Sequence, residues 1–397
     1  MLFGRRFPFY AKLVYHYDSQ AGLLSGLYQG AVLCFLAVVA RKIGSSDFQI
    51  ALITSALFWG VLFSILWAHF SSSRRKMPFF FWPTFIARGL MLLMFFVTGS
   101  FFYCFIVLLS YILEGVGAPA YGGIMKEVYP EEKRAEAMSY VRMFMYGAVM
   151  VSTLVFGFLL DHFGKESFRF LFPLGSLFGM GAVLFFRRIR IRREKISPKR
   201  KFQPFTLSAD PFKKKRFLFL ELSIFLAGFG CLLAMPAYVI LLVDYLKLSN
   251  SIIGILTFVF SFFTLIGYYF CGRYLGKKLL SALGASFILV SFIFLLYVFK
   301  SLPLLFLAAT LNGIATPAWD LGSYNYIVGI AEKKEVQNFA GMHFTLMGVR
   351  GVIGPFVGIK LLQVIGMEMT FLVSFALAIV GFFVLLKLKN VQNNLPG

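Results

Sequence analysis

One stretch of the sequence occurs twice and decides the fold: Leu113-Glu114-Gly115-Val116-Gly117-Ala118-Pro119-Ala120-Tyr121 aligns without gaps with Leu311-Asn312-Gly313-Ile314-Ala315-Thr316-Pro317-Ala318-Trp319. The copies are offset by 198 residues in a chain of 397. Just beyond them, Gly147 and Gly157 recur as Gly348 and Gly358 at an offset of 201. Self-similarity at one long period is the signature of a duplicated structural unit. The sequence therefore predicts two similar halves.

The composition places both halves in lipid. Hydrophobic residues make up 59% of the chain and charged residues 14%, against about a quarter charged in a soluble domain. The mean hydropathy is +0.80, which excludes a water-soluble globule, and 51 phenylalanines exclude a disordered chain. The apolar runs are much longer than the roughly 10 alternating residues of a membrane β-strand. We expect an all-α integral membrane protein.

Twelve apolar runs are long enough to cross a bilayer, which takes about 20 helical residues. They divide into six and six around a basic interval, which predicts two pseudo-symmetric bundles of six helices at 1–187 and 217–397, joined by a linker at 188–216. The predicted spans are 21–40, 48–69, 77–98, 101–125, 138–160, 168–187, 217–243, 251–272, 279–299, 303–328, 337–361 and 368–386.

The basic residues predict the orientation. Thirty of the 39 lysines and arginines fall on the side of the membrane that holds both termini, and seven fall on the other. Cytoplasmic loops carry such an excess. We therefore expect a multi-pass protein of the plasma or inner membrane with both termini in the cytoplasm. The net charge of +22 then reflects topology and contact with anionic lipids, so we expect no nucleic-acid partner.

Two loops carry a family resemblance. The stretch Tyr129-Pro130-Glu131-Glu132-Lys133-Arg134 resembles the acidic-basic loop between spans 4 and 5 of the major facilitator superfamily. The loop after span 2 keeps the family's basic triplet as Arg74, Arg75 and Lys76, but Ser71 stands where the family has an Asp. Its second copy is Gly272-Arg273-Tyr274-Leu275-Gly276-Lys277-Lys278. This departure weakens the usual Asp-based lock of the cytoplasmic gate, and we expect the triplet to act there instead.

The resemblance implies a transporter that moves a small molecule by rocking one bundle against the other. It also implies that spans 1, 4, 7 and 10 line a central cavity. We expect no enzyme activity, no cofactor and a monomer. The four cysteines and four histidines show no metal-ligand spacing, so we expect neither a metal site nor a disulfide framework.

Glu114 is the main candidate for proton coupling. It lies near the middle of span 4, and Tyr111 and Tyr121 share its helical face. Ionisable groups at this depth are costly and are functional by default. The alternative is a structural ion pair with Arg88 on span 3, and both roles are compatible.

Span 10 carries a polar stripe that includes Asn312 and Asp320. We expect Asp320 to assist proton coupling, and Asn312, Trp319 and Tyr324 to line the cavity. Hydrogen bonding between helices is the alternative for Asn312.

Span 11 carries His343 and Arg350 on one face, and we expect both to line the cavity. A guanidinium keeps its charge, so Arg350 needs a carboxylate or an anionic ligand. Asp320 is the expected protein partner. On other spans, we expect Arg142 to latch the cytoplasmic loops and Gln29 to line the cavity.

The substrate stays open between two classes. Aromatic cavity residues favour a small amphipathic molecule that is exported against protons. The arginines favour uptake or exchange of an organic anion bound by Arg350 and Arg88, provided that Arg350 is not already neutralised by Asp320. A non-transporting sensor or a membrane enzyme is a remote third reading, because fold alone does not fix function.

Overall fold

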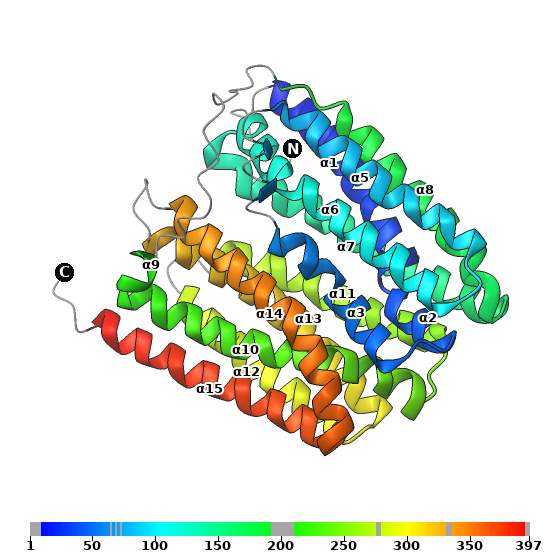
Figure 1. Ribbon diagram of the computed structural model, residues 1–397. Helices are drawn as coiled ribbons and strands as arrows, with labels where there is room; N and C mark the ends of the chain where they lie inside the picture. The colour runs from blue at the N-terminus through cyan, green and yellow to red at the C-terminus, as the bar shows by residue number, and fades with distance from the viewer. Residues whose placement is uncertain are drawn as a thin grey trace.

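The computed structural model describes residues 9–63, 66–67, 70–71, 74–191, 210–274, 279–330 and 336–393. These residues form helices and contain no strand. Eleven helical segments of the described chain are long and apolar enough to cross a membrane, and α3 is a shorter apolar helix at the position of the second predicted span. The helices run in one general direction, and the start of α1 (Phe9–Tyr28) and the end of α15 (Met367–Asn393) lie at the same end of the bundle (Figure 1). We call this the terminal end and the opposite one the far end.

The first half begins at the terminal end with a long first span. Its π-helical turn η1 follows α1 directly and leads toward α2. Ser46 caps α3 by accepting from the backbone N–H of Gln49, whose side chain in turn accepts from the Ser46 N–H. The elements are α1 (Phe9–Tyr28), η1 (Gln29–Leu33), α2 (Leu36–Lys42), α3 (Asp47–Leu62), α5 (Lys76–Gly89), η2 (Leu90–Phe96), α6 (Ser100–Val128), α7 (Glu131–His162), η3 (Lys165–Ser167) and α8 (Phe168–Arg187).

The second half repeats this course. Gly366 allows the tight connection between the last two helices, because its φ of +84° suits glycine and strains other residues. The elements are α9 (Asp210–Lys213), α10 (Lys215–Ile240), η4 (Leu241–Tyr245), α11 (Asn250–Tyr274), α12 (Leu279–Val298), α13 (Leu302–Ile330), α14 (Val336–Ile365) and α15 (Met367–Asn393).

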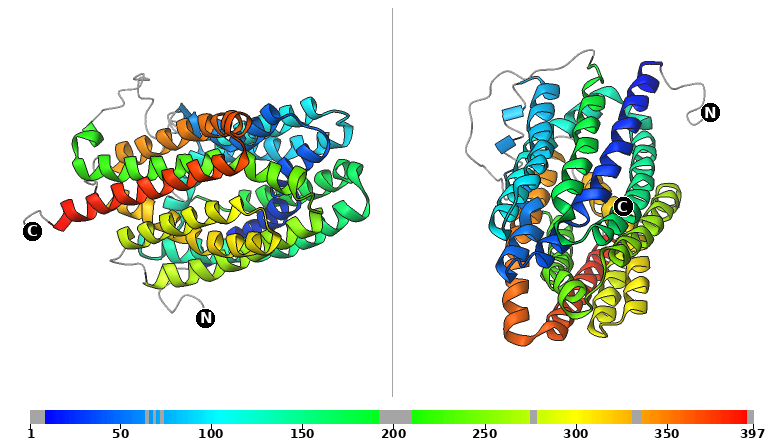
Figure 2. Two further views of the ribbon diagram at one scale, coloured as in Figure 1. Left: turned by 90° about the horizontal axis from the view of Figure 1, so that it is seen from below. Right: turned by 90° about the vertical axis from the view of Figure 1, so that its right-hand side faces the viewer.

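The helices pack as two sets. In the first, α1 lies against α7 and α8, and α5 lies against α6. In the second, α10 lies against α14 and α15, and α12 lies against α13 and α15. The right-hand view of Figure 2 shows the first set above the second. Two seams join them, α7 against α11 and α3 against α14.

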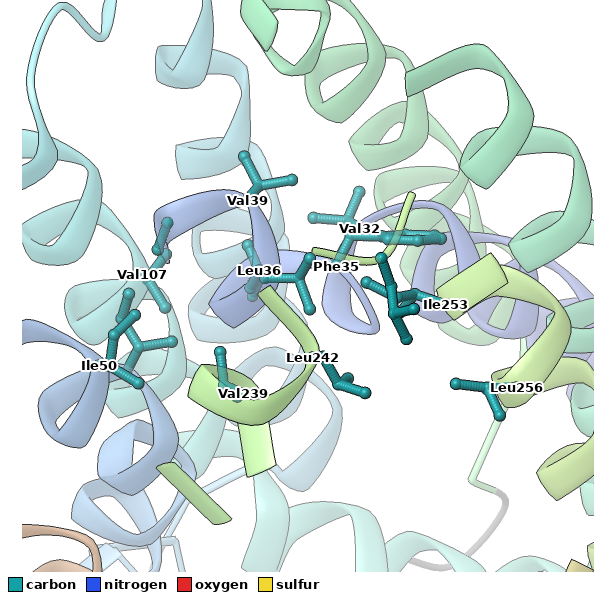
Figure 3. Packing of buried hydrophobic residues seen from close by; sticks show 14 of the residues in the cluster. Val32, Phe35, Leu36, Val39, Ile50, Val107, Val239, Leu242, Ile253 and Leu256 are labelled. Carbon is teal, nitrogen blue, oxygen red and sulfur yellow. The ribbon is translucent and has the colours of Figure 1, made fainter. Parts of the chain in front are cut away.

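Small residues set the spacing at these seams. A Cβ on Gly254 of α11 would lie 2.5 Å from the Thr153 carbonyl oxygen of α7, and a Cβ on Gly348 of α14 would lie 2.8 Å from the Leu62 Cα of α3. Glycine permits such close approach of membrane helices. Apolar side chains fill the rest of the interface: Figure 3 shows Phe35 and Leu36 of the first half next to Leu242 and Ile253 of the second.

Candidate functional site

A cavity of about 690 Å³ lies within the first half. Six residues singled out from the sequence line it, four of them expected in the cavity wall or at the proton site and two expected to be structural or gating: Gln29, Tyr111, Glu114, Tyr121, Arg88 and Arg142. The cavity extends from Asp18 and Phe186, near the terminal end, to Leu33 and Cys34 at the end of η1.

Glycines of the repeated stretch bring Glu114 to this wall. A Cβ on Gly60 of α3 would lie 2.8 Å from the Tyr111 carbonyl oxygen of α6, and a Cβ on Gly117 of α6 would lie 2.7 Å from Thr84 Oγ1 of α5. Helix α6 can therefore contact α3 and α5 closely on two faces. The approach to α5 places Glu114 beside Arg88.

Glu114 and Arg88 form an ion pair. Glu114 Oε1 accepts from Arg88 Nε at 3.2 Å and from Arg88 Nη2 at 3.1 Å. Arg88 Nη1 also donates to Ser25 Oγ at 3.2 Å and to the Gly179 carbonyl oxygen at 2.9 Å, and the guanidinium lies 5.3 Å from the centre of the Tyr28 ring. The ion pair expected as the alternative role of Glu114 is thus present. The guanidinium of Arg88 therefore contacts four residues of the first half: Glu114, Ser25, Gly179 and Tyr28.

The second copy of the repeat packs in the second half as the first copy does in the first, but it carries an amide where the first carries a carboxylate. Gly313 of α13 packs on α11, where its Cβ would lie 2.5 Å from the Phe260 carbonyl oxygen. Asn312, at the position of Glu114, lines a second cavity of about 520 Å³ with mostly apolar walls, which include Cys231 and Tyr238. Asn312 and Glu114 therefore line different cavities.

Asp320 is linked to the other half of the molecule through Tyr268. Its Oδ2 accepts from the phenol of Tyr268 on α11 at 2.7 Å, and the Tyr268 oxygen accepts from Arg142 Nη1 of α7 at 3.3 Å. Trp319, the preceding residue, packs on Phe287 within the second half, with ring centres 4.7 Å apart. The side chain of Tyr324 lies outside the described residues.

The expected pairing of Arg350 with Asp320 is wrong. Arg350 is buried and donates a hydrogen bond to the Ile224 carbonyl oxygen of α10, and among the described residues it has no ion pair with Asp320. Gly228 of α10 leaves room for its guanidinium. The reason is the direction of each side chain: Arg350 points from α14 to α10, whereas Asp320 points from α13 to α11.

Two buried carboxylates are missing from the sequence-based set. Glu221 of α10 is 3% exposed, and its Oε1 lies 2.8 Å from Nδ1 of His343, which is equally buried. The Glu221 charge also acts on Arg350. Asp18 of α1 is 2% exposed and accepts from the phenol of Tyr129 at 2.8 Å. Each is a single acid within its helix, Glu221 in the second turn of α10 and Asp18 in the middle of α1.

The three residues of the basic triplet differ in their surroundings. Arg74 and Arg75 are exposed, whereas Lys76 forms an ion pair with Glu127 and so ties the start of α5 to the end of α6. These residues lie toward the terminal end of the bundle.

The far end is joined across the two halves by polar contacts. Arg41 Nε donates to Asp244 Oδ2 at 2.8 Å, and Lys42 Nζ donates to Asn250 Oδ1 at 2.8 Å. Asp161 of α7 accepts from the backbone N–H groups of Asn250 and Ser251 at 2.8 and 2.7 Å, at the start of α11. A carboxylate at a helix N-terminus is stabilising. The far end is therefore closed by charge as well as by packing.

Within the described part of the chain, no group of three or more His, Cys, Asp or Glu side chains is placed to hold a metal ion. The four cysteines are free thiols.

Comparisons with known proteins agree with this architecture. Solved structures with the same fold include the nucleoside transporter NupG (TM-score 0.69, 15% identity, 94% of this chain and 99% of that one) and a bacterial homologue of the human lysosomal transporter Spinster (TM-score 0.68, 15% identity, 98% and 99%). The human organic anion transporter MFSD10 is a further example (TM-score 0.63, 17% identity, 94% and 99%). No curated protein sequence matches the chain.

The family model of the Major Facilitator Superfamily matches residues 19–238 and again 220–396, so that each half of the repeat is recognised separately. This agrees with two sets of packed helices joined at two seams. The chain belongs to the Major Facilitator Superfamily, and it is a multi-pass membrane transporter of a small molecule rather than an enzyme.

Proposed function

We propose that the protein exports a small amphipathic molecule in exchange for protons, with Glu114 as the proton-binding group. The observation that carries this proposal is the ion pair of Glu114 and Arg88 in the wall of the 690 Å³ cavity. Glu114 is 28% exposed there, so water in the cavity has access to its carboxylate. Arg88 is 12% exposed and is held mainly by protein groups.

A proton on Glu114 changes the energy of this pair. The ionised carboxylate compensates Arg88, and protonation leaves the guanidinium without its counter-charge in a poorly solvated place. Breaking a buried pair on one side costs about 3–5 kcal/mol, and less where water enters. Protonated and ionised Glu114 therefore favour different arrangements of α5 and α6. Such a difference is what couples a proton to alternating access.

The cavity wall supports an amphipathic substrate. Leu57, Phe80 and Phe186 contribute apolar surface, and Tyr111 and Tyr121 contribute aromatic rings with a polar tip. Binding sites for small molecules are commonly mostly apolar with a few fixed polar groups. The anion alternative based on Arg88 and Arg350 has less support, because Glu114 pairs with the first and Glu221 acts on the second.

The side on which the cavity extends supports the proposed direction. The far end is closed between the halves, and the cavity reaches toward the terminal end. With both termini in the cytoplasm, as the basic residues predict, this state takes up its substrate from the cytoplasm. We propose that one chain is the functional unit in the plasma or inner membrane, with bundles at 1–187 and 217–397. Residues 192–209 of the proposed linker at 188–216 lie outside the described residues.

The test is Glu114→Gln in proteoliposomes. A substrate is first found by thermal stabilisation of the purified protein. The variant should lose transport driven by a pH gradient but keep exchange of labelled for unlabelled substrate, because Gln fills the same space and cannot titrate. Glu166→Gln, at the far end and paired with its neighbour Arg169, is the matched control. Unaltered pH-driven transport in Glu114→Gln would refute the proposal.

A further inference from the structure

Three polar side chains from the two halves meet within the membrane-spanning helices. Arg142 comes from α7, and Tyr268 and Asp320 come from α11 and α13. The Tyr268 phenol oxygen accepts from Arg142 Nη1 at 3.3 Å, and the phenol donates to Asp320 Oδ2 at 2.7 Å. The Arg142 guanidinium also lies 5.6 Å from the centre of the Tyr268 ring. One neutral phenol therefore stands between a full positive and a full negative charge.

The charged groups of Arg142 and Asp320 are both open to further hydrogen bonds. Arg142 and Asp320 are both exposed, while Tyr268 is 5% exposed. A guanidinium offers five N–H donors, and of those on Arg142 one has a hydrogen-bond partner among the described residues. Arg88 makes four hydrogen bonds and Arg350 is buried against α10. Arg142 also lines the 690 Å³ cavity, so its free donors are open to a solute.

The hydrogen bonds of the Tyr268 phenol indicate which chemical groups a ligand would need in order to replace it. The phenol oxygen accepts from a guanidinium, as a carboxylate would. The phenol hydrogen is donated to a carboxylate, as an ammonium hydrogen would be. A solute that carries an acid and an amine close together makes both contacts with charge assistance, which strengthens each of them.

We infer that Arg142 and Asp320 form a two-point site for a zwitterionic amphiphile, with its carboxylate on Arg142 and its ammonium on Asp320. The inference rests on the proposed function and names the substrate class. Aromatic side chains flank the site: the Tyr146 and Tyr268 ring centres are 5.9 Å apart, and Tyr121 lines the same cavity as Arg142. The apolar part of the solute would lie along that cavity.

The expected effect of protonation on substrate binding agrees with the exchange of substrate for protons. An ammonium and a proton compete for the Asp320 carboxylate, so proton binding there expels the zwitterion. Among the described residues, the titratable and charged groups that face Asp320 are Arg142 and Tyr146 from α7 and Tyr268 from α11. The described part of α12 presents apolar side chains such as Phe287, and His343 and Arg350 of α14 face α10.

Three probes with one aromatic ring separate the two contacts: L-phenylalanine, phenethylamine, which lacks the acid, and 3-phenylpropionate, which lacks the amine. Binding to the purified full chain at pH 7 is measured by ligand-induced thermal stabilisation and isothermal calorimetry. L-phenylalanine should bind at least about tenfold more tightly than either fragment, since one charge-assisted hydrogen bond is worth that much.

Variants assign each contact. Asp320→Asn should reduce the affinity for L-phenylalanine to that for 3-phenylpropionate, and Arg142→Gln should reduce it to that for phenethylamine. If Arg142→Gln unfolds, Arg142→Lys takes its place in the test, because it keeps the charge. Glu368→Gln, an acid paired with Lys300 at the far end, is the control and should bind all three probes as wild type does.

Two outcomes overturn the site: L-phenylalanine binding no tighter than its better fragment, or its preference surviving in both Asp320→Asn and Arg142→Gln. If the probes fail while pH-driven transport of another solute still requires Glu114, this inference falls and the proposed function stands. If the probes bind as expected while Glu114→Gln transports normally, the proton-binding role of Glu114 falls and the two-point site stands.

Discussion

Asp161→Asn should open the far end of the molecule. Asp161 Oδ1 and Oδ2 accept from the Asn250 and Ser251 backbone N–H groups, and Oδ2 also accepts from the Ser251 hydroxyl at 2.6 Å. These bonds join α7 of the first half to the start of α11 in the second. They exist only while the two halves are together at this end. An Asn side chain keeps one acceptor and loses both the charge and the second acceptor.

The size of the effect follows from these contacts. A hydrogen bond to a charged group contributes about 1.5–3 kcal/mol, and a carboxylate at a helix N-terminus adds about 0.3–1 kcal/mol. Asp161 is partly exposed, so water replaces part of what is lost. We expect a net loss of about 2 kcal/mol from the closed state. The ratio of open to closed molecules should then rise roughly 30-fold.

A native thiol reports the opening. Cys231 lines the 520 Å³ cavity between the halves, together with Leu242 of η4. In a variant that keeps Cys231 and has the other three cysteines replaced by serine, a membrane-impermeant maleimide is added to the side on which the far end is proposed to lie. The labelling rate follows the open fraction while that fraction is small. Asp161→Asn should therefore label roughly 30-fold faster.

The control is Glu166→Gln, which removes an acid from the same end but from a pair with Arg169 inside one half. Exposed pairs of this kind contribute about 0–1 kcal/mol, so its labelling rate should stay near that of the starting protein. Equal rates for Asp161→Asn and Glu166→Gln would refute the role of Asp161 in closing the far end.

Two further changes test the packing. Glu221→Gln should lower the stability by about 3–5 kcal/mol, seen as a lower unfolding temperature in detergent, because it removes the buried carboxylate beside buried His343; an unchanged temperature would contradict this. Gly115→Ala should sharply reduce the yield of folded protein in gel filtration, because its Cβ would clash with the backbone of α3, whereas Gly122→Ala, with no atom within 4 Å of its Cβ, should match wild type. Similar yields for both alanine variants would argue against the close approach of α3 and α6.

The spans and the close helix contacts were predictable from the sequence. Apolar runs of sufficient length can only be helices in lipid, and the repeated glycines mark places where backbones meet. The pairing of Glu114 with Arg88 was within reach as well, because neighbouring spans lie side by side and both residues lie near mid-depth.

The partners of Arg350 were not predictable by the same reasoning. Counting residues from the end of a span gives the depth of a side chain but not its direction around the helix axis. Arg350 and Asp320 point to different helices, α10 and α11 respectively. Asp18 was missed for a different reason, because the first helix begins at Phe9 rather than at residue 21 and so buries a segment expected to be a tail.

The two copies of the repeat keep the same packing and differ in chemistry, and this difference supports a division of labour. Gly115 brings α6 close to α3 in the first half, and Gly313 brings α13 close to α11 in the second. Beside them stand Glu114, paired with Arg88, and Asn312, in a mostly apolar wall. A symmetric pair of acids would place two proton sites at equal depth and would hold the substrate equally in both halves. With one acid, protonation at these two repeated positions changes the energy of the first half alone. An energy change at this position of one half favours movement of that half against the other, so the difference between the two copies is itself part of the proposed mechanism.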